Sequence, residues 1–379
     1  MSIDNDLLFK EFLNRGIKES TQIRYKSILQ HYTTSTGLTP TQLIEEAEDE
    51  EDQAIRLRKR RIKKHLEQHL QYLLDKDFSP KYIQISMACI RTFYYFYDLQ
   101  LPRMKIAHMF EDAKTTLDIP SREEIRQALT HANPKFEAII LLQISSGMGL
   151  SEALSLQIKD LIKGAGLTPT SIDQLSDIDR ENTVIQWTVT RKKTGQRYWT
   201  FNTPEATGRI LDYLDKHPPS SLDTFIFRGE KGKYKDMKLR DVSMLQYFIW
   251  LNDKCGFGKV GRQRKFRSHA LRKYFANTLE SHNCPHLAIR MMMGHKVGDK
   301  TTSAYFLPDQ SRLFKEYKKV MEHLTIYEKL KHYDDTEEIV EEMQKEREED
   351  RETIKWLKEE VMVLKKQKEM DKKLDKLKR

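Results

Sequence analysis

The N-terminal part of the chain places apolar residues at helical spacing. Between Asn5 and about Lys105 they recur every three or four positions, as at Leu8 and Phe12. Ser79-Pro80 has the form of a capping residue followed by proline in the first helical turn. The helix after it is more apolar than a surface helix needs, so we interpret its aromatic stripe as core. The pattern predicts a helical domain of four or five helices over residues 1–105.

A second domain follows a connector at residues 106–120. It opens at Ser121, which has a carboxylate three residues later in the form of a capping box. A strongly apolar helix then runs from Pro134 to Ile144, and Gly147 supplies the left-handed conformation that ends helices. We place this domain at residues 121–326.

The period changes to two between Thr183 and Asn202. Residues that favour strands flank Lys192-Lys193-Thr194-Gly195, so a β-hairpin with a basic tip is predicted. Helical patterns resume at Pro204 and near Asp241. The predicted fold class is therefore mainly α with a small β-hairpin (α+β).

The last segment, residues 327–379, is dominated by Glu and Lys. Ile354, Leu357, Val361 and Leu364 follow one another at spacings of three and four, which predicts a short coiled-coil seam. A solitary charged helix is the alternative.

Composition limits the classes of protein that remain. The 379 residues are 38% hydrophobic and 32% charged, enough for two or three domains with apolar cores. The longest apolar run is far shorter than the roughly 20 residues of a membrane-spanning helix, and no signal peptide is visible. Three cysteines without metal-type spacing fit a reducing cytosol. The net charge of +9 permits a polyanionic partner but is a weak pointer to one.

Three stretches near the end of the second domain carry groups that handle phosphate. His269 and Arg272 lie three residues apart on one predicted helical face, and Ser268 is placed to cap that helix. His295 follows a glycine stop, and Tyr305 comes ten residues later. A guanidinium offers two parallel donors to two phosphate oxygens, and an imidazole can donate or move a proton. Alone, the His/Arg pair is more typical of an ordinary surface.

In combination these stretches are specific. H-x-x-R, a Gly-His about 25 residues on and a tyrosine about 10 further resemble the tyrosine recombinase (phage integrase) family. Arg191-Lys192-Lys193-Thr194-Gly195 resembles that family's catalytic-lysine hairpin. The stretches TRKKTGQRYWTFNTPEA and MGHKVGDKTTSAYF are similar to those of archaeal members. The resemblance covers about residues 118 to 325, and the helical domain before it is like the family's DNA-clamping core-binding domain.

The resemblance implies a role for each matching residue. Tyr305 attacks a DNA phosphate and forms a 3′-phosphotyrosyl bond, and Arg272 clamps the non-bridging oxygens. Lys193 protonates the leaving 5′-oxygen, with Lys192 as its rival. His269 and His295 position the phosphate and assist proton movement. The phosphotyrosine retains the bond energy, so neither a metal nor another cofactor is expected.

One motif departs from the family. The stretch that carries its first arginine, in the form G-L-R-x-S-E or G-M-x-R-x-E, here holds Gly149 and Leu150 at the two arginine positions, while Glu152 aligns. Losing one such donor typically costs about 3–4 kcal/mol. Three alternatives stay open: a slow enzyme supported by another base such as Arg191 or Arg267, an inactivated variant, or a catalytically silent DNA-binding or architectural protein derived from a recombinase.

Partners follow from the same resemblance. We expect double-stranded DNA recombination sites, a homo-oligomer that is a tetramer on paired sites, and no membrane. Candidate phosphate-facing residues are the hairpin's Arg191 and Lys192 and, before His269, the three cations Arg264, Lys265 and Arg267. The basic run from Arg56 to Lys64 is a further candidate, with a solvated helix face as the alternative. The apolar segment from Leu313 to Leu324 predicts an amphipathic helix of the kind that docks on a neighbouring protomer. Localisation is expected to be the prokaryotic cytoplasm, in association with DNA.

Overall fold

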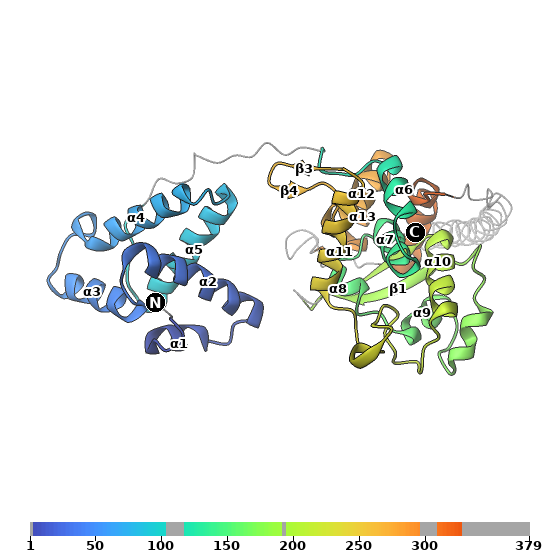
Figure 1. Cartoon of the computed structure of the whole chain (residues 1–379), viewed down its shortest axis with the longest axis horizontal. Helices are drawn as coiled ribbons and strands as arrows, with labels where there is room; N and C mark the ends of the chain where they lie inside the picture. The colour runs from blue at the N-terminus through green and yellow to red at the C-terminus, as the bar shows by residue number, and fades with distance from the viewer. Residues whose placement is uncertain (1–2, 104–116, 192–194, 296–308, 328–379) are drawn as a thin grey trace, which may run out of the picture. The chain divides into compact units, whose positions relative to one another are not determined.

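The computed structural model describes residues 3–103, 117–191, 195–295 and 309–327 (Figure 1). The chain divides into two compact units between Thr116 and Leu117. The fold class is confirmed, because both units are built mainly from helices and the described strands form two small antiparallel pairs. In the described ranges, no helix has the length and apolar character needed to cross a membrane. The predicted coiled coil lies outside the described residues.

The first unit is a set of helices around an aromatic core. Its elements are α1 (Leu7–Leu13), α2 (Glu19–Thr36), α3 (Pro40–Asp52), a 3-10 turn η1 (Leu57–Lys59), α4 (Arg61–Asp75) and α5 (Pro80–Phe96). Ser79 caps α5 through the Tyr82 amide, with Pro80 in the first turn, as the sequence predicts. The aromatic stripe of α5 is core, since Phe93 and Tyr94 are fully buried.

A buried histidine joins three helices of this unit. His69 of α4 is inaccessible to solvent, and its two ring nitrogens lie 3.0 Å from the Ser35 hydroxyl of α2 and 2.9 Å from the Ser86 hydroxyl of α5. Burial and then the nearby His31 lower the pKa of His69 to about 4. The ring is therefore neutral at pH 7, where one nitrogen donates and the other accepts.

The second unit surrounds the apolar helix α7 (Pro134–Ser146), of which Ala138 to Ser146 are buried. Before the hairpin, its other elements are α6 (Arg122–Thr130), α8 (Leu150–Ala153), α9 (Ile158–Gly164) and η2 (Ile172–Asp177). After the hairpin come α10 (Pro204–Lys216), η3 (Gly232–Tyr234), α11 (Asp241–Lys254), the short pair β3 (Lys259–Val260) and β4 (Gln263–Arg264), α12 (Ser268–Ser281), α13 (His286–Met292), α15 (Gln310–Lys318) and η4 (Met321–Leu324).

The sequence signals that bound these elements are confirmed. Ser121 and Glu124 form the capping box of α6, and Gly147 ends α7 with φ +63°. A residue with a side chain at Gly147 would meet the Phe275 ring at 2.3 Å from its Cβ. Helices α10 and α12 both pack on α7, so α7 is the axis of the unit.

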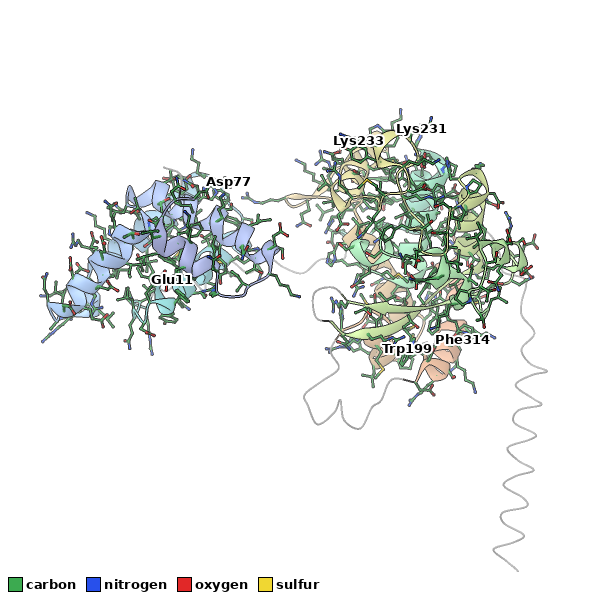
Figure 2. All side chains as sticks on the ribbon, turned by 90° about the horizontal axis from the view of Figure 1, so that it is seen from below. Glu11, Asp77, Trp199, Lys231, Lys233 and Phe314 are labelled. Carbon is green, nitrogen blue, oxygen red and sulfur yellow. The ribbon has the colours of Figure 1, made fainter. Side chains whose placement is uncertain are left out.

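The predicted hairpin consists of β1 (Ile185–Thr190) and β2 (Arg197–Asn202), paired in antiparallel register from Ile185 opposite Asn202 to Thr190 opposite Arg197. Helix α15 packs on β2, where Phe314 lies 5.2 Å from Phe201 between ring centroids. Figure 2 shows Phe314 and Trp199 at the same end of the unit.

The amphipathic segment after residue 309 forms α15, which ends at Lys318, and then the 3-10 turn η4 rather than one helix to Leu324, and its apolar side chains are buried in its own unit. Leu313, Tyr317 and Leu324 belong to the main core, and the Tyr317 hydroxyl donates to the Ser145 carbonyl at 2.8 Å. This face is therefore not available for a neighbouring protomer, in contrast to the expectation from the sequence.

The buried His69 makes the first unit sensitive to acid. The folded pKa lies below the unfolded value near 6.5, so the unfolded chain binds the proton more readily and stability falls as the pH drops from about 6.5 toward 4. We expect a loss of about 2 kcal/mol between pH 7 and pH 5 from this group. Hydrogen exchange of the α4 and α5 amides, corrected for intrinsic rates, measures the loss. His69→Gln should remove most of the pH dependence, and an unchanged dependence in this variant would contradict the assignment.

Candidate active site

The centre of the site is Arg272, a buried arginine on α12. Its residue is 7% exposed, because Leu271 and Phe275 beside it are buried in the core. The guanidinium donates to the carbonyls of Gly147 and Met293. These residues are the C-caps of α7 and α13, where helices leave carbonyls without internal partners and attract cations. Two helix ends thus fix Arg272 in place.

The start of α12 differs from the expectation in one detail. The N-cap position is Arg267, and Ser268 is the first helical residue and makes no cap. The Ser268 hydroxyl instead accepts a hydrogen bond from the Gln143 side-chain amide at 2.7 Å. This bond joins the first turn of α12 to α7, and so it positions the helix that carries Arg272.

The structure brings His295 to Arg272, as predicted. The turn at Gly294, with φ +63°, lets the chain leave α13, and Nε2 of His295 lies 3.2 Å from Nη2 of Arg272. Because a guanidinium only donates, Nε2 accepts and the proton of the neutral ring is on Nδ1. Burial, then the charges of Arg272 and Arg191, lower the pKa of His295 to about 4.

A carboxylate organises the arginines. Oε2 of Glu152 lies 4.0 Å from Nη1 of Arg272, and Oε1 lies 3.9 Å from Nε of Arg191. The same side chain accepts from the Tyr198 hydroxyl at 2.8 Å and from the Gly149 amide at 2.9 Å. Burial and the Glu152 charge raise the pKa of Tyr198 far above its usual value, so the phenol remains a donor.

Arg191 completes this group. It follows β1 directly, and its Nη1 donates to the Gly294 carbonyl at 2.7 Å. Two guanidinium groups, one carboxylate and the neutral His295 leave one net positive charge. A phosphodiester carries one negative charge, so this cluster of Arg191, Arg272, Glu152 and His295 can hold one phosphate in charge balance.

His269 lies exposed on the first turn of α12. Burial of part of the ring, then the charges of Lys273, Arg267 and Arg272, lower its pKa. Asp118 acts in the opposite direction. Partial burial and, after it, the charges of Lys273, Arg267 and Arg272 thus disfavour the protonated form of His269.

The three predicted phosphate-facing cations before His269 each contact a carboxylate of the same unit. Arg264 lies 2.9 Å from Asp253, Lys265 lies 2.6 Å from Glu124, and Arg267 lies 2.7 Å from Asp118. These pairs join the stretch before α12 to α11, to the start of α6 and to the beginning of the unit. Any contact with DNA would have to be shared with, or exchanged for, these pairs.

Tyr305, Lys192 and Lys193 lie outside the described residues. The two positions that lack the family arginine are described. Leu150 packs against the hydrophobic core, and a Cβ added at Gly149 would lie 3.0 Å from Oε2 of Glu152. Position 149 therefore points toward the charged cluster, whereas position 150 points toward the core.

Glu152 and Tyr198 are the site residues that sequence reasoning did not assign. Glu152 matched the family motif but received no role, and Tyr198 was interpreted only as a strand residue. A partial signal was available for Glu152, since a residue at the start of a helix with Glu three positions later is typical of a capping arrangement.

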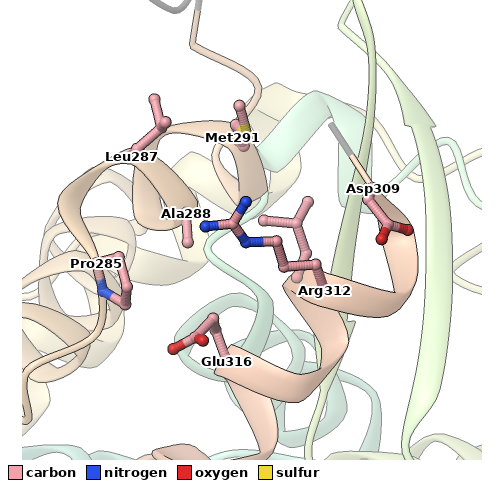
Figure 3. Close-up of a pocket in the computed structure, with 8 residues that line it drawn as sticks. Pro285, Leu287, Ala288, Met291, Asp309, Arg312 and Glu316 are labelled. Atoms are coloured by element: carbon pink, nitrogen blue, oxygen red, sulfur yellow. The ribbon is translucent and has the colours of Figure 1, made fainter. Parts of the chain in front are cut away.

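A pocket that shares no residue with this cluster lies between α13 and α15 (Figure 3). Pro285, Leu287, Ala288, Met291 and Leu313 give it an apolar lining, and Asp309, Arg312 and Glu316 supply its polar groups. It contains none of the residues predicted for catalysis.

Comparisons with known proteins define the class. The model of the phage integrase family matches residues 118–312, half of the chain, and the chain therefore belongs to this family. A comparison with curated protein sequences finds no match. The fold is that of the tyrosine recombinases.

Solved structures with this fold include complexes with DNA. A lambda integrase fragment (residues 75–356) bound to DNA has a TM-score of 0.53 at 13% identity, covering 76% of this chain and 89% of that one. The Tn1549 transposon integrase in complex with circular intermediate DNA has a TM-score of 0.52 at 15% identity, covering 82% of this chain and 97% of that one.

The turn at Gly294 is required to place His295. A Cβ at this position would lie 2.5 Å from the Tyr198 ring, in addition to the strain of a positive φ. We expect Gly294→Ala to lower the free energy of unfolding by about 2 kcal/mol more than a Gly→Ala change that only introduces backbone strain. Gly256→Ala is that control, since its φ is +71° and nothing lies within 4 Å. Urea unfolding followed by tryptophan fluorescence compares the two, and equal losses would count against the tight contact with Tyr198.

Proposed function

We propose that the protein is a site-specific DNA recombinase that cleaves and rejoins double-stranded DNA through a 3′-phosphotyrosyl intermediate. The observation that carries this proposal is the contact of Arg272 with His295, held by two helix ends and balanced by Glu152, in a chain of the phage integrase family. Arg272 would neutralise the charge that develops on the non-bridging oxygens.

The chemical step is an exchange of phosphodiester bonds. The Tyr305 oxygen bonds to phosphorus while the bond from phosphorus to the 5′-oxygen breaks. The phenol proton passes to a neutral imidazole, His269 or His295, and the leaving oxygen takes a proton from Lys193, or from Lys192. Attack by a 5′-hydroxyl of another strand reverses these changes and restores the phenol.

A second candidate function is a catalytically silent DNA-binding protein. The specific observation in its favour is the pair Gly149 and Leu150, since Leu150 packs on the core and neither residue offers a charge. In both functions the partner is double-stranded DNA. Assembly into a homo-oligomer on DNA is part of the first, in line with a lambda integrase dimer bound to a core site at a TM-score of 0.52. Three free cysteines fit the reducing cytoplasm of a prokaryotic cell.

The basic run of the first unit contains cations of two kinds. Arg60, Arg61 and Lys63 contact carboxylates, among them the buried Glu50. Arg58, Lys59 and Lys64 are exposed, and the described part of the chain gives them no ion pair. We infer that the second kind contacts DNA phosphates and that the first kind stabilises the fold.

A nicked duplex tests the enzymatic function. A duplex selected by binding from a random pool is nicked next to each candidate cleavage position, so that the leaving strand diffuses away and the covalent adduct accumulates. We expect an adduct resistant to denaturing electrophoresis with the natural chain, its loss in Tyr305→Phe, and its retention in the control Tyr234→Phe, a tyrosine that is 50% exposed. Intact DNA binding without any adduct would favour the silent binding protein.

Salt dependence tests the exposed cations. Replacing Arg58 and Lys59 with alanine should reduce the slope of log K against log salt by about 1.8, because each lost phosphate contact removes about 0.9. The matched control replaces Lys81 and Arg91, two exposed cations of α5, and should leave the slope unchanged. Fluorescence anisotropy over a range of salt concentrations measures both. An equal change in the two variants would argue against a specific contact through η1.

A further inference from the structure

We propose that Arg191 supplies the second guanidinium that clamps the scissile phosphate, in place of the arginine missing at positions 149 and 150. The inference rests on the proposed function, because it assigns a further catalytic residue to that reaction.

The first support is the arrangement around Glu152. Its two carboxylate oxygens lie 3.9 Å from Arg191 and 4.0 Å from Arg272, so one carboxylate is placed between two guanidinium groups. A bond from Arg191 to the Gly294 carbonyl, at 2.7 Å, brings it to the residue next to His295. Arg191 is therefore in the same cluster as Arg272 and His295.

The second support is the space left by the missing arginine. At Gly149 the absent Cβ would point at Glu152 and lie 3.0 Å from Oε2. A long side chain from position 149 would thus begin beside Oε2 of Glu152. Arg191 lies near the other oxygen, Oε1, of the same carboxylate. Glycine at position 149 adds no side chain of its own, so Oε2 is contacted by Tyr198 and approached by Arg272, and Oε1 faces Arg191.

Accessibility favours Arg191 as a ligand for a phosphate. Its side chain is 24% exposed, whereas that of Arg272 is 9% exposed. Part of the Arg191 side chain is thus open to solvent, while the Gly294 carbonyl accepts from its Nη1. A planar guanidinium can then donate in parallel to two phosphate oxygens, which an ammonium cannot do.

The backbone fixes Arg191 at the base of the hairpin tip. Its amide donates to the Gln196 carbonyl at 2.8 Å, and its carbonyl accepts from the Gly195 amide at 2.7 Å. The two candidate lysines, Lys192 and Lys193, follow it directly in the sequence. In the proposed reaction the clamp for the non-bridging oxygens and the candidate proton donors are thus neighbours in the sequence.

Arg267, the other candidate for the second guanidinium, makes its contacts outside the cluster. Arg267 donates to Asp118 at 2.7 Å and to the Arg264 carbonyl at 2.7 Å. It approaches neither Glu152 nor Arg272 within an ion-pair or hydrogen-bond distance in the described ranges. The charge of Arg290 on α13 also lowers the pKa of His295, so the test includes an Arg290 variant.

Single-turnover cleavage of the nicked duplex at saturating protein tests the assignment. We expect Arg191→Ala to slow adduct formation about 100- to 1,000-fold, the effect of removing one preorganised donor, and to change DNA binding far less. Arg197→Ala is the matched control, since Arg197 is an exposed arginine of β2 in the same hairpin. It should cleave at the natural rate, and Arg290→Ala should lose much less than Arg191→Ala.

A second substrate separates charge neutralisation from a structural defect. A methylphosphonate at the scissile position replaces one charged oxygen with a neutral methyl group, so less negative charge develops there. We expect the rate of Arg191→Ala relative to the natural chain to recover at least about tenfold on this substrate, while the ratio for Arg197→Ala stays at one. Both substrates are tested with the same preparation of each protein, so a partly unfolded fraction cancels when the ratio of variant to natural chain is compared between the two substrates.

The outcomes are distinct. If the natural chain forms an adduct and Arg191→Ala forms it equally fast, or shows the same defect on both substrates, the role of Arg191 is overturned and the recombinase function stands. If Arg290→Ala shows the large, methylphosphonate-sensitive loss instead, the clamp belongs to Arg290. If the natural chain forms no adduct on a duplex that it binds, the proposed function and this inference fall together.

Discussion

The buried carboxylate of Glu152 is the constraint on which the site depends. Two like charges close together in a protein repel each other, and the repulsion is stronger where less water lies between them. Glu152 lies between Arg191 and Arg272 and offsets this repulsion, and it is itself held by the Tyr198 hydroxyl and the Gly149 amide. Backbone carbonyls at the helix ends hold each arginine, and this carboxylate supplies the negative charge between them in the absence of a phosphate. The arrangement thus prepares two cations for an anion that is not yet present.

The placement of Arg272 also has a structural cause. Its guanidinium satisfies carbonyls at the ends of α7 and α13, which would otherwise lack partners in a buried position. Arg272 therefore contributes to the packing of the unit whether or not the protein cleaves DNA. The presence of this arginine alone is accordingly a weak argument for activity. The stronger argument is that His295 contacts Arg272 and that Arg191 bonds to Gly294, the residue next to His295, at the end of α13.

The sequence predicted local features well and distant pairings poorly. The capping box at Ser121, the stop at Gly147 and the pairing of two strands into a hairpin depend on residues close together in the sequence, and they form as expected. The bonds of Ser268 to Gln143 and of Lys265 to Glu124 join residues more than 100 positions apart, and no local pattern announces them. For the same reason, the cations before α12 looked free in the sequence but contact carboxylates in the fold. The contact of Arg272 with His295 could be anticipated only because a family resemblance supplied the long-range information.

The protonation states in the site favour binding of an anion before proton transfer. Burial and the neighbouring arginines lower the pKa of His295 to about 4, and the pKa of His269 is lowered as well. Both imidazoles are therefore neutral near pH 7 and leave the positive charge to the arginines. A bound phosphate would oppose the charges of Arg191 and Arg272, and so it would raise the pKa of His295 toward the range in which an imidazole accepts a proton. The substrate itself would then prepare the base, and the cluster would be less able to take up a proton in the absence of DNA.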